Sequence, residues 1–138
     1  MKTEDLSWIA GLLEGEGSFS LAYKKSPYNE YYYPRIVISM TDEDVIQRAA
    51  IIMGAKQVYV KIKLCKKTLY TTTIYGAKAI ALMRIILPFM GIRRASKINE
   101  IISTWEIISK RPDKRKTRQQ QLQKLLEVQE ALKQQEAR

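Results

Sequence analysis

The stretch WIAGLLEGEG, residues 8–17, decides the expected fold. The apolar side chains of Leu6, Ile9, Ala10 and Leu13 follow helical spacing, and glutamates then alternate with glycines. This pattern predicts a helix that stops where the glycines begin. Because the C-terminal end of a helix is already negative, two glutamates there favour a nearby cation, such as a divalent metal ion, or positive groups of a partner.

Downstream of this stretch, the hydropathy pattern predicts two hairpins and further helices. Strands have a two-residue period and helices a period of about 3.6 residues. We expect strands over residues 18–25 and 33–40, a helix capped by Thr41 that ends at Gly54, strands over 58–64 and 68–75, and helices over 76–90 and 94–110. The predicted fold class is α+β, an αββαββα unit with one antiparallel four-stranded sheet whose helices pack on one face and leave the other face free.

The chain divides at Pro112 into a folded domain, residues 1–110, and a basic, Gln-rich helical tail, residues 111–138. The tail has too little apolar surface for a core of its own. We therefore expect it to dock or to fray.

Composition restricts the function. The 138 residues include 24 Lys and Arg against 14 Asp and Glu, a formal charge of +10, which is typical of proteins that bind a polyanion or an anionic membrane. Histidine is absent, which excludes His-ligated zinc sites and Ser-His or Cys-His nucleophile pairs. Cys65 is the only cysteine, and no segment is typical of a signal peptide or of a membrane span. We expect an intracellular protein with no membrane association and no small-molecule cofactor.

The free sheet face is the first functional signal, because its outward positions are basic and aromatic with almost no carboxylate among them. These positions are Lys24, Tyr33, Arg35, Tyr59, Lys61 and Lys63. Strands can enter the major groove and reach base edges while lysines neutralise phosphates, so this face favours nucleic-acid binding over an ordinary solvated surface.

Residues 9–17 resemble the signature of the LAGLIDADG homing endonucleases. Ala10, Gly11, Leu12 and Gly17 match it by identity, and the two glutamates are conservative replacements. The expected order of elements also matches that family's unit, so the resemblance covers about residues 6–110.

The resemblance implies a site-specific double-strand DNA endonuclease that hydrolyses phosphodiesters of a long, partly palindromic target with Mg²⁺ or another divalent cation. A chain with one motif resembles the homodimeric branch, in which each subunit supplies half of the active site. By this resemblance Glu16 and the Gly15 carbonyl bind metal, and Lys97 acts beside the scissile phosphate. Arg93 and Arg94 would contact phosphates. The dimer interface would contain Ala10, Gly11 and Glu14.

For base readout, the family uses alternate positions of the four strands. In this sequence they are Ser20, Ala22, Lys24, Ser26, Tyr33, Arg35, Val37, Ser39, Tyr59, Lys61 and Lys63. In the fourth strand two choices stay open, namely Tyr70 and Thr72, or Thr71 and Thr73.

One departure from the family keeps other functions open. Met40 stands where many relatives carry a glutamine that orients water, and Asp42 or Gln47 could replace that glutamine. The alternatives are a non-cutting DNA or RNA binder on the same scaffold, such as an intron maturase or a transcription regulator, and a general basic nucleic-acid-binding module.

Overall fold

The computed structural model describes residues 1–28, 30–64, 66–109 and 114–136, and describes side chains in the last range only from residue 122. Cys65 and Pro112 lie outside the described residues. Two compact units are present, Met1–Glu106 and Ile107–Arg138. The predicted division at residue 110 stays a prediction.

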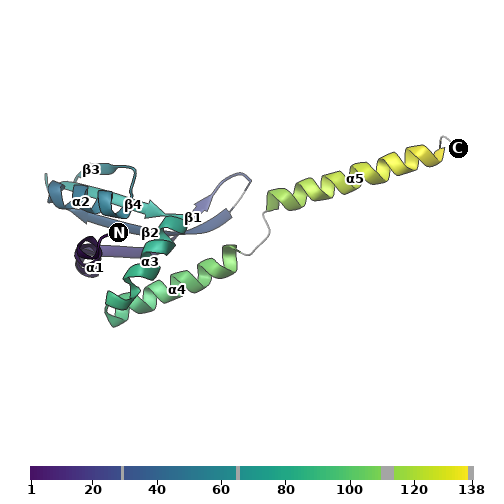
Figure 1. The fold of residues 1–138 in the computed structure, drawn as a ribbon. Coiled ribbons are helices and arrows are strands. Elements are labelled where there is room, and N and C mark those ends of the chain that lie inside the picture. Colours follow the sequence, from purple (N-terminus) through teal and green to yellow (C-terminus); the bar gives the residue numbers. More distant parts are fainter. Residues whose placement is uncertain (29, 65, 110–113, 137–138) are drawn as a thin grey trace. The chain divides into compact units, whose positions relative to one another are not determined.

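The helices and strands follow the predicted order (Figure 1). They are α1 (Thr3–Glu16), β1 (Gly17–Lys25), β2 (Glu30–Met40), α2 (Glu43–Met53), β3 (Val58–Ile62), β4 (Thr68–Tyr75), α3 (Gly76–Ile86), a 3₁₀ turn (Leu87–Phe89), α4 (Ile92–Ser109) and α5 (Lys114–Glu136).

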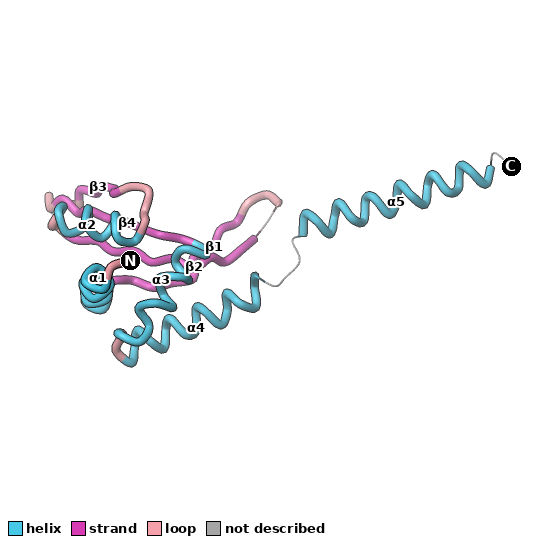
Figure 2. Tube along the Cα trace, viewed as in Figure 1, coloured by secondary structure: helices cyan, strands magenta, loops and turns pink. Residues whose placement is uncertain are grey.

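The four strands form one antiparallel sheet in the order β1-β2-β4-β3 (Figure 2). Gly17 pairs with Ile38, Ile38 pairs with Thr72, and Thr72 pairs with Val58, which defines one row across the sheet. β1 and β3 are its two edge strands. This arrangement confirms the predicted α+β fold class.

The hydrophobic core lies between one sheet face and the helices. Ile36 and Ile38 of β2 are fully buried against Leu13 of α1, Ile46 of α2 and Met83 of α3. α4 adds two further buried isoleucines to the same cluster. The opposite sheet face, called the outer face below, carries the side chains that alternate with this core. No described helix is long and apolar enough to span a membrane.

The end of α1 differs from the prediction, because the helix continues through both glutamates. Gly17 follows it in an extended conformation and donates its backbone N–H to the Leu13 carbonyl. A Cβ at Gly17 would lie 2.6 Å from that carbonyl oxygen, so glycine is needed here for close approach to the last helical turn. Elsewhere α2 begins after Asp42 rather than Thr41, and α3 ends at Ile86 rather than near residue 90.

α5 belongs to the second unit. The described apolar side chains of this helix are exposed, namely Leu122, Leu125, Leu126, Val128 and Leu132. Whether the tail docks or frays stays a prediction.

Candidate acidic site and nucleic-acid interface

Arg94, in the first turn of α4, binds the C-terminal end of α1. Its guanidinium donates to the carbonyl oxygens of Glu14 and Gly17, each at 2.5 Å, and more weakly to that of Gly15 at 3.5 Å. The last carbonyls of a helix have no partner within the helix and carry partial negative charge. The Arg94 side chain is only 17% exposed, so its charge acts mainly on this helix end.

Glu14 makes the reverse contact with the start of α4. Its Oε2 accepts a hydrogen bond from the Gly91 backbone N–H at 3.1 Å and lies 3.8 Å from Arg94 Nε. A carboxylate is favoured at the positive N-terminal end of a helix. A Cβ at Gly91 would lie 2.7 Å from Glu14 Oε1, so a side chain there would displace the carboxylate. Glu14, Gly15, Gly17, Gly91 and Arg94 together form what we call the α1–α4 junction.

Glu16 differs from Glu14, although only one residue separates them. Its side chain is exposed and makes no hydrogen bond or ion pair with any described residue. Arg94 binds the carbonyls of Gly15 and Gly17, so the backbone is held on both sides of Glu16. Glu16 is therefore a free carboxylate on a backbone that the α1–α4 junction holds in place.

A shallow hollow of about 390 Å³ lies beside the first residues of β1. Ser18, Arg93 and Lys97 line it, and Lys97 Nζ lies 3.9 Å from Glu100 Oε2. Arg93 is exposed. Arg94 lines it too, so this hollow gathers all three of the cations that the resemblance assigned to phosphate contacts.

The predicted metal ligands, Glu16 and the Gly15 carbonyl, can be compared with the chemistry that a divalent cation prefers. Within the described ranges, no three Asp, Glu, His or Cys side chains cluster closely enough to hold a metal ion. Glu16 and the Gly15 carbonyl are hard oxygen donors, which is the chemistry that Mg²⁺ and Ca²⁺ prefer. They can supply part of a divalent-cation site.

The outer face combines cations, hydroxyls and aromatic rings. Arg35 Nε donates to Ser20 Oγ at 3.4 Å, and the hydroxyls of Ser39 and Thr71 lie 2.8 Å apart. The Tyr33 ring packs near those of Tyr31 and Tyr75, with centroids 6.0 and 5.6 Å away. No Asp or Glu occupies an outward position in any of the four described strands. The face can therefore offer donors and positive charge to a polyanion without nearby repulsion.

The strand register confirms most outward positions that alternation predicts. Residues on this face of the strands include Ser20, Ala22, Lys24, Tyr33, Arg35, Val37, Ser39, Tyr59 and Lys61. Ser26 and Lys63 lie just beyond the ends of β1 and β3. The register also settles the fourth strand, since Thr71 and Thr73 pair with outward residues. Sequence reasoning missed Tyr31 and Tyr75, which share this face. The DNA contacts of all these residues stay a prediction.

Ala10, which the resemblance predicts at the dimer interface, and Met40, which stands in the place of the family's glutamine, both turn inward. Ala10 is 2% exposed and packs in the chain's own core, so its side chain is not available to a partner. Helical phase explains this, because Ala10 lies three residues before the core residue Leu13 and so shares its face of the helix. Met40 pairs with Tyr70 on the core side of the sheet and packs against the core.

The exposed stripe of α1 consists of Ser7, Gly11 and Gly15, spaced four residues apart. A Cβ added at either glycine would meet no atom within 4 Å. Residues four apart lie on one helix face, so this stripe is the smooth side of α1. Gly11 keeps its predicted place on an accessible surface, whereas Glu14 contacts α4 of its own chain.

Comparison with known proteins gives a structural match without a sequence match. No protein-family model and no curated protein sequence matches the chain. The homing endonuclease I-CvuI in complex with its target superposes with a TM-score of 0.63 at 11% identity, over 79% of this chain and 72% of that chain. The intron-encoded homing endonuclease I-CeuI, complexed with DNA, gives 0.60 at 18% identity, over 78% and 56%.

The LAGLIDADG meganuclease I-CpaMI, bound to uncleaved DNA, gives a TM-score of 0.61 at 14% identity, over 75% of this chain and 36% of that chain. At such identities the likeness concerns the fold. It agrees with the resemblance carried by residues 9–17, which lie at the end of α1. The chain has the fold of the LAGLIDADG homing endonucleases.

Proposed function

We propose that this chain is a LAGLIDADG-type DNA endonuclease that acts as a homodimer and requires a divalent cation. One observation carries the proposal. Of the two glutamates at the end of α1, Glu14 is bound within the chain and Glu16 is left free on a fixed backbone. A free carboxylate held in this way suits a ligand that is not part of the chain.

Double-stranded DNA is the substrate that the outer face fits. Lys24, Arg35 and Lys61 supply positive charge, and serine, threonine and tyrosine hydroxyls supply donors and acceptors between them. Side chains of this kind read base edges in the major groove while cations neutralise phosphates. The fold neighbours named above include DNA complexes, which supports the same substrate.

Glu16 and the Gly15 carbonyl would hold the cation. When bound, a divalent cation supplies the positive charge that promotes attack on phosphorus and stabilises the departing oxygen. Arg94 keeps the two ligand-bearing residues in place through the Gly15 and Gly17 carbonyls. Lys97, at the hollow beside β1, would donate to the scissile phosphate. None of these roles needs a histidine.

A homodimer would complete this site. Each chain offers one free carboxylate at the end of α1, and two strands of DNA require two cleavage events. The stripe of Ser7, Gly11 and Gly15 would let two α1 helices approach closely, because small residues allow backbones to come together. This packing would bring Glu16 of one chain near Glu16 of the other.

A second function keeps DNA binding but removes cleavage. The inward side chain of Met40 favours it, since a methionine packed against the core cannot orient water as glutamine does. Asp42 and Gln47 are both exposed, and either could take over that task.

A cleavage assay that compares the parent with a Glu16→Gln variant separates the two functions. The parent is incubated with a randomised DNA library and Mg²⁺ or EDTA, and cut ends are sequenced. We expect the parent to cut defined sites with Mg²⁺ only, and the variant to cut on the order of 10²-fold more slowly, as when one group that stabilises transition-state charge is lost.

Glu43→Gln is the matched control, because Glu43 is an exposed glutamate in the first turn of α2 and has no role assigned in the proposed site. It should cut as the parent does. Parent protein that binds specific DNA without nicking it would favour the non-cutting function. Equal cleavage by Glu16→Gln and parent would contradict the assignment of Glu16.

A further inference from the structure

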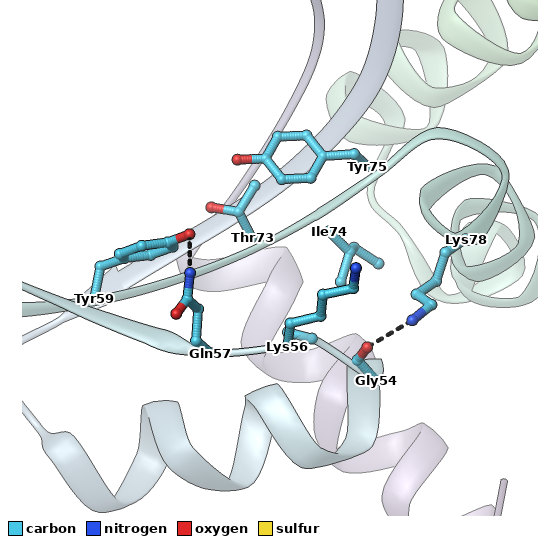
Figure 3. A pocket seen from close by; sticks show the side chains of 9 residues that line it. Gly54, Lys56, Gln57, Tyr59, Thr73, Ile74, Tyr75 and Lys78 are labelled. Carbon is cyan, nitrogen blue, oxygen red and sulfur yellow. Dashed lines mark hydrogen bonds between the residues drawn. The ribbon is translucent and has the colours of Figure 1, made fainter.

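A second hollow, also of about 390 Å³, lies at the β3 edge of the sheet (Figure 3). It opens where β3 ends its pairing with β4, since Val58 pairs with Thr72 and the next β4 residues have no β3 partner. Lys56, Gln57, Tyr59, Tyr75 and Lys78 line it, among others. We call it the β3-edge pocket.

The charge of this pocket is uniformly positive. Lys56 and Lys78 are both exposed, and no Asp or Glu lines it. Lys78 Nζ donates to the Gly54 carbonyl at 2.8 Å, which fixes the ammonium at the pocket wall. An ammonium has three donors, so this bond leaves two for a ligand. Lys56 forms no ion pair with any described residue.

Neutral donors accompany the two lysines. Gln57 Nε2 donates to the Tyr59 hydroxyl at 2.5 Å, which orients both groups. In the view of Figure 3, the hydroxyls of Tyr59, Thr73 and Tyr75 lie at one end of the pocket and the two ammonium groups at the other. Several donors around positive charge with no acid nearby form a receptor for a small anion that has several oxygen atoms.

The position of the pocket indicates where such an anion would come from. Tyr59, Thr73 and Tyr75 are outer-face residues, so the pocket opens beside the surface that we assign to DNA. The major groove is about 12 Å wide, whereas four strands at about 4.8 Å spacing span about 14 Å. A sheet placed over the groove therefore brings its edges to the two sugar-phosphate backbones. The hollow with Arg93 and Lys97 lies at the β1 edge, and the β3-edge pocket lies at the other.

We propose that the β3-edge pocket binds a phosphate of the DNA backbone through Lys56 and Lys78, while the outer face reads the bases. This inference rests on the part of the proposed function that concerns DNA binding, and it does not require that the DNA is cut. Phosphate contacts position a protein on the duplex and carry no sequence information. The pocket would thus set the register of the sheet along the groove.

The test is the salt dependence of binding to a labelled random-sequence duplex, measured by fluorescence anisotropy with the full chain. For each phosphate neutralised, log K falls with log salt concentration by a slope of about 0.9. We expect the Lys56→Gln, Lys78→Gln double variant to make the slope shallower by about 0.9 for each bound protomer, and each single variant to produce part of that change. An unchanged slope in Lys56→Gln would overturn the proposal.

Arg84→Gln is the matched control for one lost charge. Arg84 lies on α3 like Lys78 but pairs with Glu106 at 3.1 Å on an exposed surface away from the pocket. The slope of log K against log salt concentration for Arg84→Gln should equal that of the parent. Lys78→Gln also loses the bond to Gly54, so thermal unfolding of each variant is recorded, and Lys56→Gln carries the conclusion.

A second measurement separates this proposal from the proposed function. Inorganic phosphate is titrated into the isotope-labelled protein, and the backbone amide shifts of Gly54, Gln57 and Lys78 are followed by NMR. Saturable shifts in the parent that are lost in the Lys56→Gln, Lys78→Gln double variant support the pocket even if the parent fails to bind duplex. Duplex binding by the parent without any saturable shift, and with an unchanged slope in Lys56→Gln, overturns the pocket and leaves the proposed function standing.

Discussion

The α1–α4 junction and the outer face of the sheet carry similar groups but use them differently. At the junction, Arg94 binds backbone carbonyls and Glu14 binds a backbone amide of the same chain. On the outer face, Arg35 has one long bond to Ser20, and Lys24 is exposed. The difference separates two uses of charge. Groups that bind their own chain build the site, and groups left to solvent are available for a ligand.

Arg94→Ala should produce the largest effect on this contrast. It removes hydrogen bonds from a charged donor to the end of α1 and leaves Glu14 without its cation. Hydrogen bonds to charged groups contribute about 1.5–3 kcal/mol. We expect the free energy of unfolding, measured by urea denaturation, to fall by about 2–3 kcal/mol, and cleavage to fall as well, because the backbone around Glu16 is released.

Arg93 is the control, because it precedes Arg94 in the chain but is exposed and lines the hollow. Arg93→Ala should change the unfolding free energy by less than about 0.5 kcal/mol, as is usual for surface positions. Equal losses in the two variants would remove the distinction between the junction and the exposed cations.

Arg35→Ala should show the opposite pattern. Its guanidinium makes only a 3.4 Å contact with Ser20, so we expect the unfolding free energy to change by less than about 0.5 kcal/mol. DNA binding should weaken about tenfold on the preferred site, within the range of about 1–3 kcal/mol for one good base contact.

Competition binding against random-sequence duplex measures the Arg35 effect. The loss should be greater for the preferred site than for random DNA, whereas Lys56→Gln should weaken both alike. A uniform loss for Arg35→Ala would assign Arg35 to phosphate contact. If Arg35→Ala instead lowered the unfolding free energy as much as Arg94→Ala does, the Arg35 side chain would stabilise the fold and not be reserved for a ligand.

The sequence predicts the outer face better than the junction, and the reason is the range of the interactions. Alternation along a strand is local, so the outward places of Lys24, Arg35 and Tyr59 follow from neighbouring residues alone. The end of α1 depends on Arg94, about eighty residues further along the chain, which satisfies carbonyls that the glycine pattern alone would leave to water. A local helix-stop rule therefore ends the helix too early.

In the fourth strand, the sequence alone does not distinguish the residues that face the core from those that face outward. Residues 70–73 read YTTT, and threonine is compatible with either face of a sheet. Pairing with β2 decides the matter, since Thr72 lies opposite Ile38 in the core, where its hydroxyl donates to the Gln57 carbonyl. Thr71 then faces outward beside Ser39.

The β3-edge pocket could not be predicted for a similar reason. Lys56 and Lys78 stand 22 residues apart, one in the loop between α2 and β3 and the other on α3, and each is typical of a solvated surface. The hollow exists because β3 pairs with β4 only as far as Thr72. Such a local break in pairing has no signature in side-chain hydropathy.

Gly11→Ala should have a small, stabilising effect on the single chain, but its effect on the dimer should have the opposite sign. Gly11 is an exposed glycine inside α1 with no atom within 4 Å of an added Cβ, so alanine should stabilise the monomer by about 0.5–1 kcal/mol. In the proposed dimer, the same methyl group would separate two closely packed helices and weaken association.

Sedimentation velocity over a dilution series gives the dimer dissociation constant, and urea denaturation at the lowest concentration gives monomer stability. Ile51→Ala is the control, because Ile51 is 80% exposed on α2 and its change also favours helix without touching α1. Gly11→Ala should raise both monomer stability and the dissociation constant, whereas Ile51→Ala should leave the dissociation constant unchanged. If Gly11→Ala stabilises the monomer and leaves association intact, the stripe of Ser7, Gly11 and Gly15 faces solvent and not a second α1. The free carboxylate of Glu16 would then have to act without a second copy of the chain beside it.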